Sequence, residues 1–138
     1  MYLTINDLKT FVDSEDYEIL ARADENPEAV NECIKGAESR IIDTLDAVYN
    51  ILEEMEKTGD ERKKTLVSIC SHLALWGLYQ AISPRNIPET RLYNYEAAIK
   101  DLEDIRKGKL LKSLPAYMDS TATTAAQFGV NENLNLLY

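Results

Sequence analysis

The stretch that decides the fold runs from Thr65 to Ile82 and reads TLVSICSHLALWGLYQAI. It is apolar nearly all round a helical projection, and such a helix lies inside a protein core or a membrane. Because His72 and Gln80 interrupt the run, we expect the central helix of a soluble bundle, over 60–82, and no membrane partner. The side chains expected to face the core from this helix are Leu66, Ile69, Cys70, Leu73 and Trp76. A buried Trp76 would make Trp76→Ala cost about 3–5 kcal/mol.

Two further helices are expected to flank this one. Apolar residues in steps of three and four predict a long helix over 27–58, with Asn26 as its cap and Pro27 in its first turn. Its inward face is expected to hold Val30, Ile34, Ala37, Ile41, Leu45, Val48, Leu52 and Met55. Another helix is expected over 88–107, ending at Gly108. Its inward face is expected to hold Leu92, Tyr95, Ala98, Ile99, Leu102 and Ile105.

Shorter helices are expected ahead of the long one, at about 4–12 and 15–23. The sequence therefore predicts an all-α fold: a small helical bundle with one long helix, short N-terminal helices and an extended C-terminal tail. The expected boundaries are 1–112 for the helical domain and 113–138 for the tail. The residues on which the expected core depends are Ile41, Leu45, Leu73, Trp76, Tyr95, Ile99 and Leu102.

The tail is too polar to build a core of its own. Residues 113–138 are rich in Ser, Thr, Asn and Ala, and Asp119 and Glu132 are their only charged side chains. Ordering such a segment costs about 1–2 kcal/mol per residue in backbone entropy, so contacts must offset that cost. We expect the tail to be ordered by an adjacent subunit or another protein, and the alternative is a tail folded back on its own helices. The expected contact residues are Tyr117, Phe128, Leu134, Leu136 and Tyr138.

Charge is distributed unevenly along the chain, whose formal net charge is -9. Residues 1–61 hold 17 acids and 5 bases, a net of -12, and residues 62–138 hold 7 acids and 10 bases, a net of +3. A protein that grips nucleic acid normally has a basic excess, so this chain is not expected to bind DNA tightly. One interpretation is a polarised subunit whose acids face a neighbour or passing DNA, and the other is a solvated acidic surface. The acids considered for a channel or subunit interface are Asp46, Glu53, Glu54 and Glu56.

Residues for catalysis or metal binding are scarce. His72 is the only histidine, so histidine-based catalysis and metal clusters have little to build on, and a hydrogen-bonded core histidine is the favoured interpretation. Cys33 and Cys70 fall in apolar helical patterns and are expected to be buried free thiols. We therefore expect no catalytic residues, no metal and no cofactor. The opening residues also lack the basic and apolar regions of a signal peptide.

One enzyme class uses an all-α fold and could be considered: the magnesium-dependent nucleotide pyrophosphatases. Their chemistry needs carboxylates one turn apart on two helices, because a hard metal ion takes several oxygen ligands. The available acids are Glu53, Glu54 and Glu56 on one helix and Asp101 and Asp104 on another. The spacing fits poorly, since Lys57 stands where a third acid is wanted.

Four motifs, in order, carry a resemblance to a known family. They are Met1-Tyr2-Leu3-Thr4-x-x-Asp7-Leu8, Ala37-Glu38-Ser39-Arg40-Ile41-Ile42-Asp43-x-Leu45, Leu73-Ala74-Leu75-Trp76-x-Leu78-Tyr79 and Tyr95-Glu96-Ala97-Ala98-Ile99-x-x-Leu102-x-x-Ile105-x-x-Gly108. With these motifs the chain resembles the head–tail connector (adaptor, or head-completion) proteins of tailed bacteriophages, in particular the Mu-like prophage subgroup. Two segments depart from the family: 47–57 continues as acidic helix where a loop with aromatic residues and proline is common, and 113–138 has no counterpart.

The resemblance implies a structural virion protein at the head–tail interface, made in the cytoplasm of the host bacterium. Its members form a homo-oligomeric ring, commonly of twelve subunits, that docks on the portal protein. The ring extends the channel through which DNA passes and gives the next tail-proximal protein a surface to bind. The alternative is a cytoplasmic helical protein-binding module that forms no ring.

Overall fold

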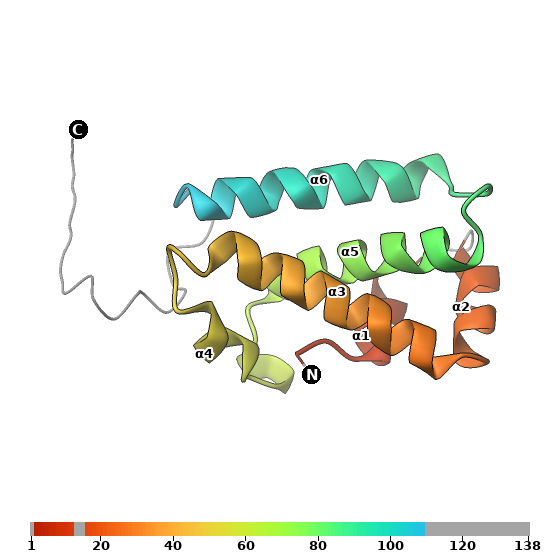
Figure 1. Ribbon diagram of the computed structural model, residues 1–138, viewed down its shortest axis with the longest axis horizontal. Coiled ribbons are helices and arrows are strands. Elements are labelled where there is room, and N and C mark those ends of the chain that lie inside the picture. The colour runs from red at the N-terminus through yellow and green to blue at the C-terminus, as the bar shows by residue number, and fades with distance from the viewer. Residues whose placement is uncertain (1, 13–15, 110–138) are drawn as a thin grey trace, which may run out of the picture.

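The central helix of the fold is α5, Lys64–Ile82, as the sequence predicts. The structure is a computed structural model that describes residues 2–12 and 16–109. In it α5 packs against α3, Pro27–Leu45, and against α6, Glu89–Arg106, and the three helices run alongside one another (Figure 1). The short helices α1, Ile5–Thr10, and α2, Tyr17–Asp24, also contact α5. The expected all-α bundle with short N-terminal helices is confirmed.

Local sequence signals fix several helix ends. Thr4 caps α1 and forms a reciprocal capping box with Asp7, which satisfies backbone N–H groups of the first turn. The side chain of Asn26 accepts a hydrogen bond from the N–H of Ala29 at the start of α3. At the other end of the bundle Gly108 has φ 81°, a left-handed conformation that only glycine adopts without strain. These signals place the ends close to where the sequence predicts them.

The expected long helix over 27–58 is wrong beyond Leu45. The chain turns at 46–50 and resumes as the short helix α4, Ile51–Met55, followed by a 3-10 turn, Gly59–Glu61. α3 and α5 have 19 residues each, so a straight continuation of 13 residues would extend about 20 Å past the other helices, with nothing to pack against. The break instead lets Ile51 turn back and become completely buried.

Most of the expected core is confirmed, with two kinds of exception. Ile41, Leu45, Leu73 and Leu102 are buried. Trp76, Tyr95 and Ile99 are only partly buried, and the Trp76 ring stacks on Tyr95 with 4.6 Å between ring centroids. Three residues expected to face inward are exposed instead, namely Val48, Leu52 and Leu92. The break after Leu45 explains the first two, because the helical period on which they were placed ends there.

α5 is also the one helix in the described part of the chain that is long and apolar enough to cross a membrane. The core helix of a soluble protein passes the same test. Here 56% of the apolar window is buried by the rest of the bundle. The burial fits a core helix.

Candidate interaction surface and the polar networks that shape it

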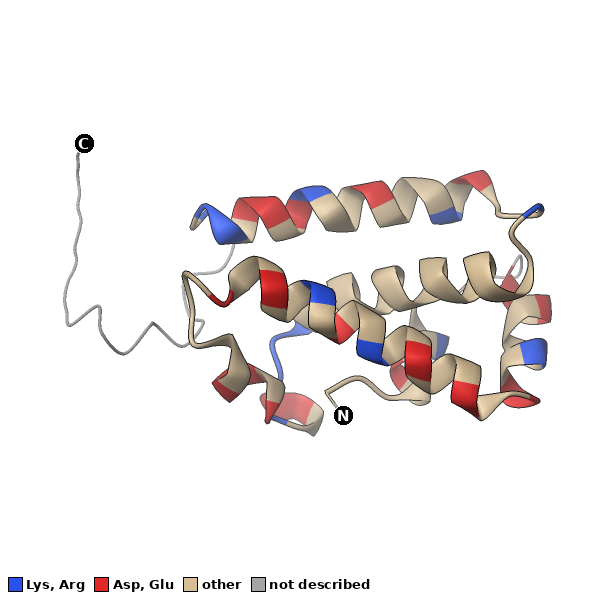
Figure 2. Cartoon of the chain, viewed as in Figure 1, with Lys and Arg blue, Asp and Glu red and all other residues tan. Residues whose placement is uncertain are grey.

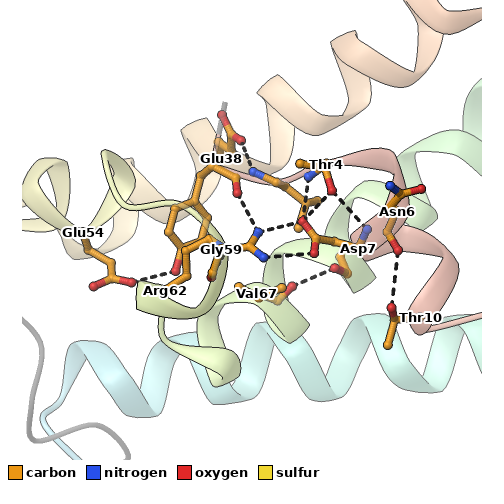
Figure 3. A network of polar contacts seen from close by, with 12 residues as sticks. Thr4, Asn6, Asp7, Thr10, Glu38, Glu54, Gly59, Arg62 and Val67 are labelled. Carbon is orange, nitrogen blue, oxygen red and sulfur yellow. Dashed lines mark hydrogen bonds and ion pairs between the residues drawn. The ribbon is translucent and has the colours of Figure 1, made fainter.

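Glu54 is the centre of a buried polar network that joins α4 to the N-terminal segment and to the start of α5 (Figure 3). Its side chain is completely buried. The hydroxyl of Tyr2 donates to Oε2 at 2.7 Å, and the backbone N–H of Lys63 donates to the same oxygen at 2.9 Å. The ammonium of Lys57 lies 3.1 Å from Oε1 and balances the charge. Removing any partner would leave polar atoms without a hydrogen bond in the protein interior.

The network keeps Glu54 ionised although it is buried. Burial alone raises the pKa of the carboxyl, but hydrogen bonds from Lys63 and Tyr2 and the Lys57 ammonium outweigh it and hold that pKa below its ordinary value. Burial and the neighbouring carboxylate together raise the pKa of the Tyr2 phenol, which stays a donor. The expectation that Glu54 faces a channel or a subunit interface is therefore wrong, because its side chain is completely buried inside the subunit.

Arg62 continues this network toward α1. Its guanidinium donates to the carbonyl of Tyr2 at 2.8 Å and to both oxygens of Asp7, at 2.7 and 3.1 Å. The hydrogen bonds from Arg62, helped by those from Thr4, outweigh burial, which raises the pKa, and the pKa of Asp7 is lowered to about 2. The N–H of Leu3 donates to Glu38 on α3 at 3.0 Å. The N-terminal residues are thus held between α3 and the loop before α5.

A second buried network ties together the starts of α2 and α6. Asp16 and Arg91 are each 2% exposed and form an ion pair at 2.7 Å. Tyr79 of α5 donates to Asp16 at 2.5 Å, and Arg91 donates to the carbonyl of Phe11 at 3.2 Å. Arg91 also lies 3.1 Å from Nδ1 of His72. Because a guanidinium can only donate, Nδ1 accepts and the imidazole is neutral, protonated on Nε2.

The expectation of a hydrogen-bonded histidine is met by His72, which is partly buried. Burial, and then the positive charge of Arg91, lower the pKa of this imidazole. The apolar pattern of this helix did not identify Arg91 as a buried residue, because Arg91 is charged. Its position carried a signal: Arg91 stands four residues before Tyr95 and seven before Ala98, on the inward face of the same helix.

Three of the four acids considered for a channel or interface are exposed. Asp46 lies in the turn after α3, and Glu53 and Glu56 lie in and just after α4. Figure 2 shows that the charged residues along α4 and the turns beside it are mostly acidic. The exposed side chains of Val48 and Leu52 lie among these acids in sequence, so apolar and acidic groups share one end of the bundle. The tail residues Tyr117, Phe128, Leu134, Leu136 and Tyr138 lie outside the described residues.

Within residues 2–12 and 16–109, no group of three or more His, Cys, Asp or Glu side chains is placed to hold a metal ion. The carboxylates considered for a magnesium site do not converge in this part of the chain. Cys70 is buried and Cys33 is partly buried, and both are free thiols. Burial raises the pKa of each thiol.

Together these observations define a small all-α protein. Its buried polar groups hold the helices together, and exposed apolar and acidic side chains lie close in sequence at the turn after α3 and in α4. The family model described as Bacteriophage Mu, Gp36 matches residues 2–131, and the chain belongs to this family. It is therefore a protein of the Mu-like phage group, and the family suggests a structural or assembly role. The match includes 113–131, for which no family counterpart was expected. Comparisons with curated proteins and with solved structures found no match.

Proposed function

We propose that this chain is a head–tail connector subunit of a Mu-like phage, present in the virion at the head–tail interface. In this proposal, copies form a closed ring, commonly of twelve, that docks on the portal and extends the DNA channel. The ring also offers a surface to the tail-proximal protein. The observation that carries the proposal is the family match over 2–131, together with the four ordered motifs of the sequence.

The construction of the subunit supports this role. The hydrogen bond from Tyr2 to Glu54 and the buried ion pair between Arg91 and Asp16 fix the N-terminal part of the chain to the helices, so the described bundle is braced as one body. A ring of identical subunits needs such a body with two different surfaces, because each copy meets one neighbour on each side. The exposed acids Asp46, Glu53 and Glu56 would suit a channel wall, since like charge lets DNA pass without adhering.

The proposal is tested by deleting the gene for this chain from the phage that encodes it and inducing the phage. We expect DNA-filled heads and separate tails to accumulate, and the full-length chain supplied in trans to restore joined particles. Electron cryomicroscopy of the restored particles should place a ring of the chain between portal and tail. Infectious particles formed at normal yield without the chain would contradict the proposal and favour the helical binding module.

A further inference from the structure

A groove with a mainly apolar lining lies between the N-terminal segment, the end of α2 and the first half of α3. Its volume is about 460 Å³, within the range of about 300–1,000 Å³ that is usual for pockets that bind a ligand. The apolar residues that line it are Leu3, Ile5, Ala23, Pro27, Val30 and Ile34. Asp24 and Asn31 also line the groove and are exposed. Such a lining suits aliphatic side chains of a partner.

The rim of the groove has an excess of negative charge. Asp24, Glu25 and Glu28 are exposed there, and no described residue forms an ion pair with them. The remaining charged side chains of the rim are paired, Glu32 with Lys35 at 4.0 Å and Arg22 with Glu18 at 3.9 Å. Lys9, one turn beyond Ile5 on α1, is an unpaired base on this side. Three unpaired acids against one unpaired base favour a partner with positive charge.

The segment that follows α6 has the complementary composition. Residues 107–114 read KGKLLKSL, with three lysines, three leucines and no acid, and we call them the basic leucine segment. Lys107 and Lys109 are exposed and form no ion pair within the described part of the chain. The base just before them, Arg106, is already paired with Glu103 at 2.8 Å. The segment therefore offers leucines for an apolar groove and lysines for an acidic rim.

The start of the basic leucine segment is held at the end of the bundle away from the groove. The hydroxyl of Tyr49 donates to the carbonyl of Ile105 at 2.7 Å, which places the end of α6 beside the turn after α3 (Figure 1). The N–H of Lys109 donates to the carbonyl of Asp104 at 2.9 Å, so Lys109 stays at this end. The groove, in contrast, lies along the first half of α3.

The leucines next to α6 are too far from the groove of their own subunit to enter it. Of the lining residues on α3, Ile34 is the closest to the end of that helix, and it precedes Leu45 by 11 positions, about 17 Å along the axis. Leu110 and Leu111 follow Lys109 directly, and an extended chain takes them at most about 7 Å from it. The groove that these leucines can reach therefore belongs to another copy.

We propose that the basic leucine segment of one copy binds the groove of the next, with Leu110 and Leu111 on the apolar lining and the lysines beside the rim acids. The inference rests on the proposed ring function and supplies a contact between neighbours. Groove and segment are different surfaces, so the contact is heterologous; it repeats from copy to copy and closes into a ring where the rotation between neighbours allows it. Its ion pairs make the contact weaken as salt concentration rises.

Cross-linking between two different variants tests the contact. Full chains with Asn31→Cys in the groove and with Ser113→Cys in the segment, each in a Cys33→Ala background, are supplied together to a phage that lacks its own copy. Cys70 stays in place because it is buried. Purified particles are treated with a short bismaleimide and analysed on a denaturing gel. We expect dimers from the mixture, since a link between the two variants can only join different copies, and monomers from each variant alone.

The matched control replaces Asn31→Cys by Thr90→Cys, an exposed position in the first turn of α6, and should give no dimers. A ring in particles without dimers from the mixture would overturn the contact and leave the proposed function standing. Dimers from Asn31→Cys alone would also overturn it, because they indicate a symmetric contact.

The double variant Asn31→Cys/Ser113→Cys shows whether a chain fills its own groove. A link between the two cysteines of one chain, without dimers from the mixture, would overturn the contact between copies. A link from Asn31→Cys to another phage protein would overturn it as well. Absence of the wild-type chain from particles would overturn the proposed function, and the contact would fall with it.

A charge exchange decides the case if the cysteine variants fold but do not enter particles. Lys109→Glu/Lys112→Glu should lower incorporation by about tenfold or more, because like charges then meet at the rim. Adding Asp24→Lys/Glu28→Lys should recover much of the loss, since opposite charges face each other again. The number of copies per purified particle measures incorporation.

The control for the exchange adds Asp43→Lys/Glu96→Lys instead, two exposed acids outside the groove, and should recover nothing. A chain that carries both the segment and the rim changes, keeps its helical circular dichroism spectrum and incorporates no better than the segment variant would contradict the proposed pairing. Equal recovery by the control would contradict it too, because only the net charge would then matter.

Discussion

Glu53 and Glu54 are adjacent in sequence, but the fold exposes one side chain and buries the other. Glu53 is exposed, whereas Glu54 is completely buried and accepts hydrogen bonds from Tyr2 and Lys63. No local pattern distinguishes the two, because Tyr2, whose hydroxyl donates to Glu54, lies 52 positions away along the chain. The burial of Glu54 therefore could not be predicted without the tertiary contacts.

Replacing these two glutamates separately should have very different effects on stability. Glu54→Ala leaves the Tyr2 hydroxyl and the Lys63 N–H without an acceptor, and we expect it to lower the free energy of unfolding by about 2–3 kcal/mol. Glu53→Ala is the matched control and should change it by less than about 0.5 kcal/mol. Urea unfolding followed by circular dichroism measures both. Equal effects would contradict the buried network.

The stability of the fold depends on pH through the carboxyl group of Asp7. Its pKa in the folded protein is about 2, below the ordinary 3.8, chiefly because Arg62 donates to the ionised carboxylate. A carboxyl with a lower pKa in the folded state stabilises the fold above about pH 4, and this stabilisation is lost as the pH falls toward 2. We expect Asp7→Asn to cost about 1–2 kcal/mol at pH 7 and progressively less toward pH 2.

Thermal unfolding at a series of pH values tests this dependence. The control is Asp43→Asn, since Asp43 is exposed on α3. The difference in melting temperature between wild type and Asp7→Asn should narrow as the pH is lowered from about 5 to about 2. A constant difference over that interval would show that the Arg62 pair does not set the pKa of Asp7.

Among the elements, those with a strong apolar pattern were predicted well. α5 is identifiable because its apolar residues cover nearly every side, and Gly108 marks the end of α6. The break between α3 and α4 was missed because Val48 and Leu52 happen to continue the apolar spacing of α3. Their spacing is helical, but the other helices end before they could cover a continued helix. Helix length is thus decided here by what is available to pack against.

The central position of α5 is tested by comparing two leucines. Leu75 on α5 is completely buried, and Leu75→Ala should lower the free energy of unfolding by about 2–5 kcal/mol, as for other large-to-small core changes. Leu92 on α6 is 39% exposed, so Leu92→Ala should cost less than about 1 kcal/mol. Both are measured by urea unfolding. A similar loss for the two would contradict the packing around α5.

At the scale of the whole molecule, the exposed acids are expected to act in assembly. Neutralising three of them together, as Asp46→Asn/Glu53→Gln/Glu56→Gln, should change ring formation or the retention of DNA in particles. Glu54 is left intact because it is buried. The control neutralises Glu28, Glu32 and Asp43, which are exposed on α3. Infectious particles at normal yield from the first variant would mean that these acids only keep the protein soluble.

The tail is expected to matter for assembly and not for folding of the bundle. Deleting 113–138 should leave a soluble helical monomer that no longer joins the particle, since the expected contact residues are removed. The family match extends into this segment, to residue 131. Circular dichroism and the protein content of purified particles measure the two properties. A truncated chain that still enters complete particles would contradict the role given to the tail.

The buried network at Arg91 has a consequence for how the protein is synthesised. Asp16 and its partner Arg91 are 75 positions apart, and at about 5–20 residues per second the ribosome adds the second about 4–15 s after the first. Tyr2 likewise needs Glu54 and Arg62, and Leu3 needs Glu38, all of which are made later. During this interval Leu3 and Leu8, which are buried in the finished fold, have no cover and are available to a chaperone. Residues 2–8 are therefore made before the partners that pack them.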